Sequence, residues 1–303
     1  GSPQEVIDKT LTFREHFGPD GGYCTYPLYQ IGRLYALSRD PTALRAVDEL
    51  CRWICFMSMP DGNRWIGPTS WNARIAASSA EHMWGAGYKF AAADSDWAAL
   101  LYRHLNRQPG YYDLADPLWQ EGTEPPDKPT LLMTSLTRGV RPGAAMPALA
   151  AAPAFTDVGD GHEFFTIRRG AYYAIVYSGR RIPFWMDIAL GGASNFSGGG
   201  LAGLFLAGAD APLLLGRVNR EYGWPPEKWE EMCVPVATGE TSDGRVFNTG
   251  ICRSQVEAPA ADWTIVTRGE TIAVPVGFTR RYRFNEDSVD ASIEISNTDL
   301  DTD

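Results

Sequence analysis

Residues 161–177, GHEFFTIRRGAYYAIVY, decide the fold of the second half of the chain. Two runs rich in aromatic and β-branched residues, 164–169 and 171–177, lie on either side of Gly170, a pattern that predicts a β-hairpin. The second run is apolar on both of its faces, as expected of a central strand that is covered from two sides. The sequence therefore predicts antiparallel β-structure in this half.

Further strands are predicted towards the C-terminus. From Val289 to Ser296, apolar residues alternate with polar ones, which predicts a strand with one buried and one wet face. The preceding strand, 278–284, is separated from it by a turn at 285–287. A second hairpin is predicted from strands 263–267 and 271–276, with Arg-Gly-Glu at 268–270 as its turn. Strands of this kind, spaced by glycine-rich turns, favour an antiparallel β-sandwich, which we assign to residues 155–303.

The first half of the chain carries the helical pattern. Asp40 followed by Pro41 predicts a helix start, because an Asp side chain caps the first turn and proline fits the first helical position. A buried stripe follows at helical spacing, formed by Leu44, Val47, Cys51, Ile54 and Cys55. Further helices are predicted over 28–38, from Ser79 and after Ser95. Because short links favour antiparallel neighbours, residues 1–108 are expected to form helical hairpins.

Between the two halves, residues 109–154 are rich in prolines, which break regular structure, and are expected to be a connector. The chain stops at Asp303, directly after the last predicted strand, where a sheet would have an unpaired edge. The helical half is also short for a closed array of helical hairpins. We therefore expect either a fragment that lacks an upstream segment or a chain that is completed by a partner, such as a second copy.

Composition narrows the class of function. The formal net charge of -10 argues against a nucleic-acid partner. No run of 18 apolar residues is present, so no membrane span is expected. The five cysteines form no CxxC pair, no cluster of metal ligands is visible, and the common nucleotide and hydrolase motifs are absent, so no cofactor is predicted. No signal peptide is visible; a secreted or periplasmic location is compatible with the chain, and the compartment stays open.

Three segments resemble one family. They are 20–29 (DGGYCTYPLY), 60–62 (PDG) with 67–74 (GPTSWNAR), and 161–173 (GHEFFTIRRGAYY). Together they resemble the heparinase II/III-type polysaccharide lyases, in which an (α/α) toroid is followed by an antiparallel β-sandwich. The resemblance implies a partial toroid in the first half, a groove between the two parts, an acidic polysaccharide or oligosaccharide as partner, and cleavage by β-elimination at a uronic acid.

In that reaction the substrate carboxylate is neutralised, a base removes the C5 proton, and an acid protonates the leaving oxygen. Asn72 and Arg74 are the predicted neutralisers, because an amide and a planar guanidinium both donate to a carboxylate and positions two apart in an extended segment point the same way. The predicted base or acid is Tyr26 or Tyr29, and the predicted partner in proton transfer is His82 or His162. Predicted substrate contacts are Tyr23, Trp65, Trp71 and Arg168.

Each of these residues also has an ordinary explanation. Asn72 can stabilise a loop, Arg74 can pair with an acid elsewhere, and a single Tyr more often packs in a core or wall. Two other functions stay open. One is glycoside hydrolysis by a pair of carboxylates, for which Asp20, Asp61, Glu15 and Glu81 lie in or near the same loops, although their spacing specifies no pair. The other is a non-catalytic subunit that holds glycans on aromatic side chains.

Overall fold

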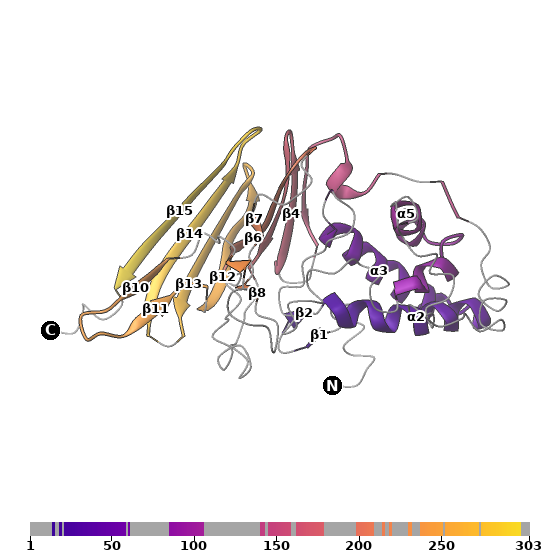
Figure 1. Ribbon diagram of the computed structural model, residues 1–303, viewed down its shortest axis with the longest axis horizontal. Coiled ribbons are helices and arrows are strands. Elements are labelled where there is room, and N and C mark those ends of the chain that lie inside the picture. Colours follow the sequence, from indigo (N-terminus) through magenta and orange to yellow (C-terminus); the bar gives the residue numbers. More distant parts are fainter. Residues whose placement is uncertain are drawn as a thin grey trace. The chain divides into compact units, whose positions relative to one another are not determined.

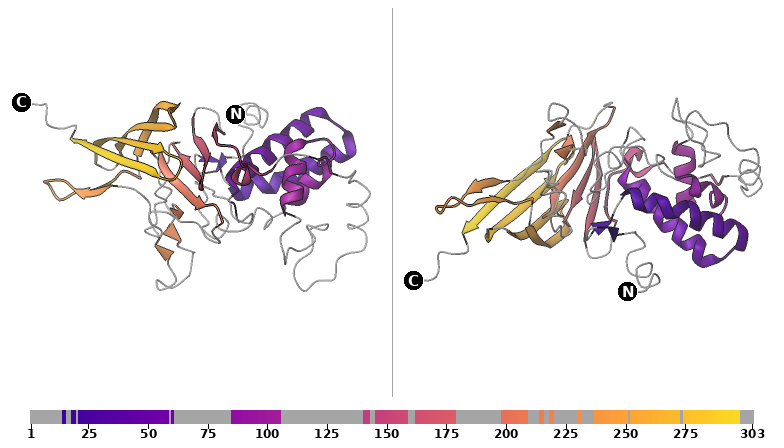
Figure 2. Two further views of the ribbon diagram at one scale, coloured as in Figure 1. Left: turned by 90° about the horizontal axis from the view of Figure 1, so that it is seen from above. Right: turned by 60° about the horizontal axis from the view of Figure 1, so that its bottom comes forward.

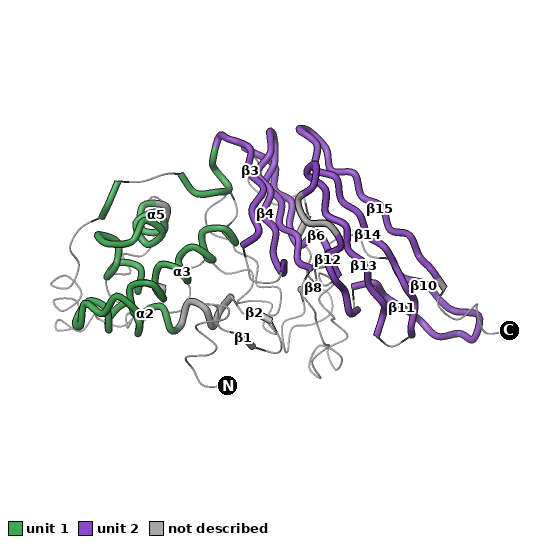
Figure 3. Tube along the Cα trace, turned by 180° about the vertical axis from the view of Figure 1, so that it is seen from behind, with its two compact units in different colours: residues 1–14, 19–67, 75–150 green, residues 15–18, 68–74, 151–303 purple. Residues whose placement is uncertain are grey.

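The computed structural model describes residues 14–15, 18–19, 21–58, 60, 85–105, 140–142, 145–158, 162–178, 198–208, 214–215, 218–219, 230–231, 237–250, 252–272 and 274–297. The chain divides into two compact units, one of which holds all the described helices and the other the main sheets (Figure 3). The protein is therefore mixed α+β with a large share of antiparallel β-structure.

The helical unit contains α2 (Gly21–Ser38), α3 (Pro41–Met57), α5 (Asp96–Leu105) and the 3-10 helices η1 (Gly85–Phe90) and η2 (Pro147–Leu149) (Figure 1). The helix predicted over 28–38 is confirmed as the later part of α2, which begins earlier, at Gly21. The helix starts predicted at Asp40 and Ser95 are also confirmed. The Asp40 carboxylate accepts from the backbone N–H of Thr42 at 2.8 Å, and the Ser95 hydroxyl accepts from the N–H of Ala98 at 3.0 Å. The helix predicted from Ser79 begins outside the described residues. No described helix is long and apolar enough to cross a membrane.

Packing in this unit depends on two glycines. A Cβ on Gly32 of α2 would lie 2.4 Å from the carbonyl oxygen of Gly87, and one on Gly87 would lie 2.1 Å from the carbonyl oxygen of Leu28. The backbones of α2 and η1 therefore touch, which only glycine permits at both positions. On α3 the predicted stripe is confirmed at four of its five positions: Val47, Cys51, Ile54 and Cys55 are fully buried, whereas Leu44 is half-buried.

The β unit is built on two antiparallel sheets. The five-stranded sheet has the order β3 (Ala154–Asp157), β4 (Phe164–Arg169), β5 (Tyr172–Tyr177), β6 (Gly200–Leu206) and β7 (Leu214–Leu215). The four-stranded sheet has the order β12 (Cys252–Ala261), β13 (Thr264–Thr271), β14 (Val276–Phe284) and β15 (Val289–Asn297). Figures 1 and 2 show these last four strands, in orange to yellow, side by side as one layer.

Three short strand pairs complete the described β-structure. They are β1 (Arg14–Glu15) with β2 (Gly18–Pro19), β8 (Val218–Asn219) with β9 (Glu230–Glu231), and β10 (Thr238–Glu240) with β11 (Val246–Asn248). The last pair is a hairpin with an exposed turn, in which Arg245 bonds to Asp243 at 2.6 Å.

The hairpin predicted from residues 164–177 is confirmed. β4 and β5 pair antiparallel over their full lengths, and Gly170 lies in the turn between them with a φ of 40°. β5 is the central strand of its sheet, and all six of its residues are buried, as its apolar pattern predicted. One of its faces, formed by Tyr172, Ala174 and Val176, packs in the core that is shared with the four-stranded sheet.

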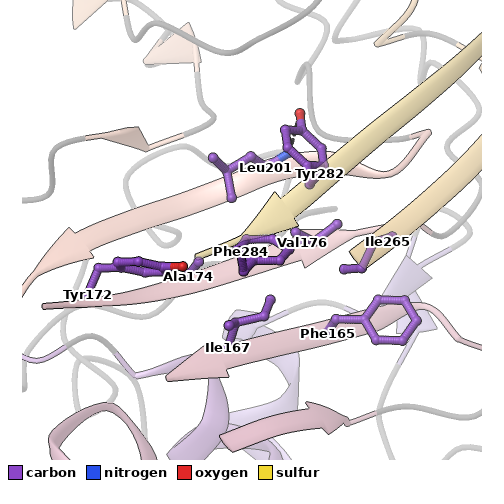
Figure 4. Packing of buried hydrophobic residues seen from close by; sticks show 9 residues of the cluster. All are labelled: Phe165, Ile167, Tyr172, Ala174, Val176, Leu201, Ile265, Tyr282 and Phe284. Carbon is purple, nitrogen blue, oxygen red and sulfur yellow. Dashed lines mark hydrogen bonds between the residues drawn. The ribbon is translucent and has the colours of Figure 1, made fainter. Parts of the chain in front are cut away.

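The two sheets share one hydrophobic core, as in a β-sandwich (Figure 4). Its buried residues are Phe165, Ile167, Tyr172, Ala174, Val176 and Leu201 from the five-stranded sheet and Ile265, Tyr282 and Phe284 from the four-stranded sheet. Side chains on alternate positions of each strand face this core, since successive residues of a strand point to opposite faces. Burial of this apolar surface is what holds the two sheets together.

The turn predicted at 268–270 is wrong. β13 runs through these residues without interruption, and Gly269 pairs with Phe278 of β14. A Cβ on Gly269 would lie 2.3 Å from the Phe278 ring, so this glycine makes room for an aromatic side chain and does not form a turn. The predicted strand 271–276 is wrong as well, because β13 ends at Thr271 and β14 begins at Val276. On its other side β13 is joined to β12 by a turn at Asp262 and Trp263, whose φ angles are 50° and 59°.

The last predicted strand is confirmed, but its buried face is only partly covered. The turn before it closes through a bond from the N–H of Asn285 to the carbonyl of Ser288 at 2.9 Å. Val289 and Ile293 are half-buried, whereas Ala291 and Ile295 are exposed. The physical reason is position: β15 is the edge strand of its sheet and pairs with β14 along one side.

Candidate functional site

The predicted site residues divide into three groups. Five lie outside the described residues: Trp65, Trp71, Asn72, Arg74 and His82. Tyr23 and Tyr26 lie in the first turns of α2, where the backbone alone is described. Three are described with their side chains, Tyr29 in the helical unit and His162 and Arg168 in the β unit.

Tyr29 and Arg168 are both engaged in packing or in turn closure. The Tyr29 ring is half-buried and lies 5.8 Å from the ring of Phe90, centroid to centroid. The Arg168 guanidinium donates from Nη1 to the carbonyls of Gly170 at 2.8 Å and of Tyr172 at 2.9 Å. Arg168 thus helps to close the β4–β5 turn.

His162 lies where β3 and β4 bring two other side chains beside it. Asp157 is the last residue of β3 and pairs in register with Phe165 of β4. Because paired residues of an antiparallel sheet carry their side chains on the same face, Asp157 and Phe165 are neighbours there. His162 precedes β4 by two positions and contacts both of them.

The His162 ring contacts Asp157 at its Nδ1 edge and Phe165 on its face. Its Nδ1 lies 2.5 Å from Oδ2 of Asp157, and its plane stacks on the Phe165 ring at 13° with centroids 6.1 Å apart. About half of the His162 side chain remains exposed, against a third of Asp157. A contact between Nδ1 and a carboxylate favours the tautomer with the proton on Nδ1, which leaves the lone pair on Nε2. The pair can therefore accept and return a proton at Nε2.

The backbone at His162 is unusual. Its φ is 62°, in the left-handed region that costs a residue other than glycine roughly 1–2 kcal/mol. The carbonyl oxygen of His162 accepts from the buried Ser178 hydroxyl at 2.5 Å. The next carbonyl, that of Glu163, accepts from the N–H of Ser178 at 2.8 Å. Backbone strain of this kind persists only where the surroundings determine it, and it is often found at functional sites.

Sequence reasoning found His162 but missed Asp157, Phe165 and Ser178. Asp157 follows Phe155 by two positions at the end of a strand, so the two side chains lie on the same, core-facing side. A carboxylate on that side, close in sequence to His162, was a signal that could have indicated Asp157. Ser178 carried no signal, because it contacts the His162 turn only after the hairpin brings residues 16 positions apart together.

The tyrosines of the β unit with a perturbed pKa are unsuited to act as bases. Burial raises the pKa of Tyr172 to about 12, although the Arg169 guanidinium acts in the opposite direction. Burial also raises the pKa of Tyr282, which accepts from the N–H of Leu201 at 3.3 Å. A higher pKa keeps each phenol protonated near neutral pH, since the charged form is disfavoured in an apolar surrounding.

Within the described ranges, neither the buried cysteines nor the buried Arg280 forms a second candidate site. Burial raises the pKa of the Cys51 and Cys55 thiols, which fits the predicted core thiols. Among the residues that the structure describes, no group of three or more His, Cys, Asp or Glu side chains could hold a metal ion. The buried Arg280 guanidinium bonds to the carbonyl of Gly198 at 2.7 Å and to the Thr249 hydroxyl at 3.0 Å, within the packed interior.

Comparison of the chain with protein-family models, with curated proteins and with solved structures gives no match. The resemblance to heparinase II/III-type lyases therefore stays a prediction that rests on the three quoted segments.

Proposed function

We propose that the chain is part of a polysaccharide lyase that cleaves a uronic-acid-containing glycan by β-elimination. The observation that carries the proposal is the contact between His162 and Asp157: a half-exposed imidazole whose Nδ1 is held by a carboxylate. Such a pair is suited to take up a proton at Nε2. β-Elimination needs a base of this kind, because the proton at C5 of the sugar must be removed. The three segments that resemble the lyase family provide the substrate class.

The reaction assigns a separate task to each predicted residue. The amide of Asn72 and the guanidinium of Arg74 would donate to the uronate carboxylate and stabilise the enolate that forms when the C5 proton leaves. The imidazole of His162 would take that proton at Nε2. The C4–O4 bond then breaks, a C4=C5 double bond forms, and the departing O4 receives a proton from Tyr26, Tyr29 or His82.

Asp157 has an electrostatic role in this proposal. When Nε2 takes up the proton, the ring becomes a cation, and a carboxylate 2.5 Å from Nδ1 stabilises that charge. It also keeps the proton of the neutral ring on Nδ1, so that Nε2 is available before the reaction begins.

The architecture is included in the proposal. α2 ends at Ser38 and α3 begins at Pro41, so the two helices form one hairpin with a two-residue link. We assign this hairpin to part of an (α/α) toroid, in which such hairpins repeat. We likewise assign the two antiparallel sheets, which share a core, to the β-sandwich of the same family.

The test is a panel of uronate-containing glycans followed by ultraviolet absorbance, because β-elimination leaves an unsaturated uronide. We expect absorbance to rise with at least one member of the panel, and His162→Ala to lower the turnover rate by about 10²- to 10⁴-fold. Arg281→Ala, a change on the exposed face of β14, is the control and should turn over normally.

Three outcomes would contradict the proposal. New reducing ends without absorbance would indicate a hydrolase, binding without either product would indicate a glycan-binding subunit, and full activity of His162→Ala would remove this histidine from the reaction.

A further inference from the structure

The environment of His162 is more constrained than a surface turn requires. The ring has a charged partner and an aromatic neighbour, and the backbone is held in the left-handed region. Asp157 and Phe165 act on the ring, whereas the backbone is held by one other side chain, that of Ser178.

Ser178 lies directly after β5, opposite the residues that enter β4. Its side chain is buried, with 4% of its surface exposed. The hydroxyl lies 2.5 Å from the His162 carbonyl oxygen and 3.4 Å from that of Glu163, and the N–H bonds to Glu163 at 2.8 Å. Two consecutive carbonyls are thus held by a single residue.

Ser178 is itself fixed from the second sheet. Its carbonyl oxygen accepts from the Ser254 hydroxyl of β12 at 3.3 Å. A chain of hydrogen bonds therefore runs from the four-stranded sheet through Ser178 to the peptide group between His162 and Glu163. Orienting that peptide group sets ψ of His162, and ψ together with φ sets the direction in which the ring leaves the backbone.

We infer that Ser178 is a positioning residue for His162: its hydroxyl keeps the left-handed backbone in place and so keeps Nδ1 against Asp157. Without that bond, the backbone can relax to an ordinary φ, and the ring turns away from the carboxylate and from Phe165. The catalytic meaning of this inference rests on the proposed function, but the ring position can be measured without any substrate.

The experiment is a series at position 178 that varies the strength of the donor. Ser178→Thr keeps a hydroxyl, Ser178→Cys replaces it by a weak donor of similar size, and Ser178→Ala removes it. The control is Ser58→Ala, which also deletes a buried hydroxyl bonded to a carbonyl, that of Ile54 at 2.7 Å, but lies in the helical unit.

The first readout is the nitrogen and proton spectrum of the His162 ring, assigned by its loss in His162→Gln. A Nδ1 proton bonded to a carboxylate has a strongly downfield resonance and marks the tautomer. We expect this signal in the wild type, Ser178→Thr and Ser58→Ala, a weakened signal in Ser178→Cys, and its loss in Ser178→Ala. An unchanged signal in Ser178→Ala overturns the inference. So does a loss of the signal that is equal in Ser178→Thr, Ser178→Cys and Ser178→Ala, because it would not depend on the strength of the donor.

The second readout is turnover. Small displacements of a catalytic group lower kcat more than substrate binding, so we expect kcat of Ser178→Ala to fall by about tenfold or more with KM within about twofold. If the wild type shows no lyase activity but the Nδ1 proton signal weakens as the donor at position 178 weakens, the proposed function fails and the positioning role stands. If the wild type is an active lyase and the signal does not respond to position 178, the positioning role alone is overturned.

Discussion

The two ends of the β4–β5 hairpin differ in the kind of contact that they make. At the turn, Arg169 donates to the carbonyl of Phe284 at 2.6 Å and Tyr172 donates to that of Asn285 at 2.6 Å, so the β4–β5 turn is tied to the β14–β15 turn. At the open end, a half-exposed imidazole faces a carboxylate.

The difference in contacts indicates that the turn end of the hairpin serves stability, whereas the open end is suited to chemistry. At the turn end of the hairpin, the acceptors are backbone carbonyls, whose position follows from the sheets themselves. The donors are the Arg169 guanidinium and the Tyr172 phenol, whose pKa is raised by burial. The open end combines an imidazole and a carboxylate in direct contact, the kind of pair that transfers protons in enzymes. The turn end is therefore suited to hold the two sheets together, and the open end is suited to move protons.

The largest effect on stability is expected from Gly170→Ala at the turn end. The φ of Gly170 is 40°, and a Cβ there would lie 2.3 Å from the carbonyl oxygen of Glu286, so the β14–β15 turn must move. We expect a loss of about 3 kcal/mol in the free energy of unfolding, measured by denaturant titration. Gly244→Ala is the control, because its φ is also positive, at 81°, but the nearest atom would be 3.7 Å away. An equal loss of unfolding free energy in both variants would contradict this. It would show that backbone strain accounts for the loss and that the contact between the β4–β5 and β14–β15 turns does not.

The next effect is expected from Asp157→Asn at the open end. The amide keeps the size of the side chain but removes the charge that stabilises a protonated ring, so we expect kcat to fall by about 10²-fold. Stability should change by less than about 1 kcal/mol, because the pair is partly exposed. Asp243→Asn removes a carboxylate from the exposed β10–β11 turn and should leave kcat unchanged. Normal kcat together with a lower free energy of unfolding in Asp157→Asn would contradict the prediction and would show that the contact between Asp157 and His162 serves stability.

The smallest effect is expected from Tyr172→Phe, which removes the bond to Asn285 and should cost about 1 kcal/mol. The pKa of Tyr172 in the folded protein is raised to about 12, above the value of about 10 in an unfolded chain. Its contribution to stability is thus fully present below pH 10 and is lost as the pH rises through 12. The difference in melting temperature between wild type and Tyr172→Phe should shrink over that range, and a constant difference would contradict the raised pKa.

Local signals were sufficient for most of the elements that they addressed. The caps at Asp40 and Ser95 act on N–H groups two and three residues away, and the hairpin of 164–177 is specified by two strand-like runs and one glycine. The turn at 285–288 also closes within four residues. These interactions lie within the reach of a few residues, so the printed sequence contains both partners.

The erroneous turn at 268–270 shows where such reasoning ends. A glycine between two strand-like runs is read as a turn, but Gly269 has no side chain because Phe278 of the next strand occupies the space. The same holds for the candidate site. His162 was selected by its type and place, whereas its partners Asp157 and Ser178 follow from the pairing of β3, β4 and β5.

The sequence by itself determined the α+β class, the helix starts on α3 and α5, the central strand β5 and the choice of His162 as a candidate. Tertiary structure alone decided which carboxylate holds the imidazole, which hydroxyl holds its backbone, and where the β4–β5 turn meets residues more than 100 positions away. The reason is physical: helix caps and hairpin turns join neighbours in the chain, but strand register and sheet stacking bring together side chains whose separation in the sequence carries no information about their distance in space.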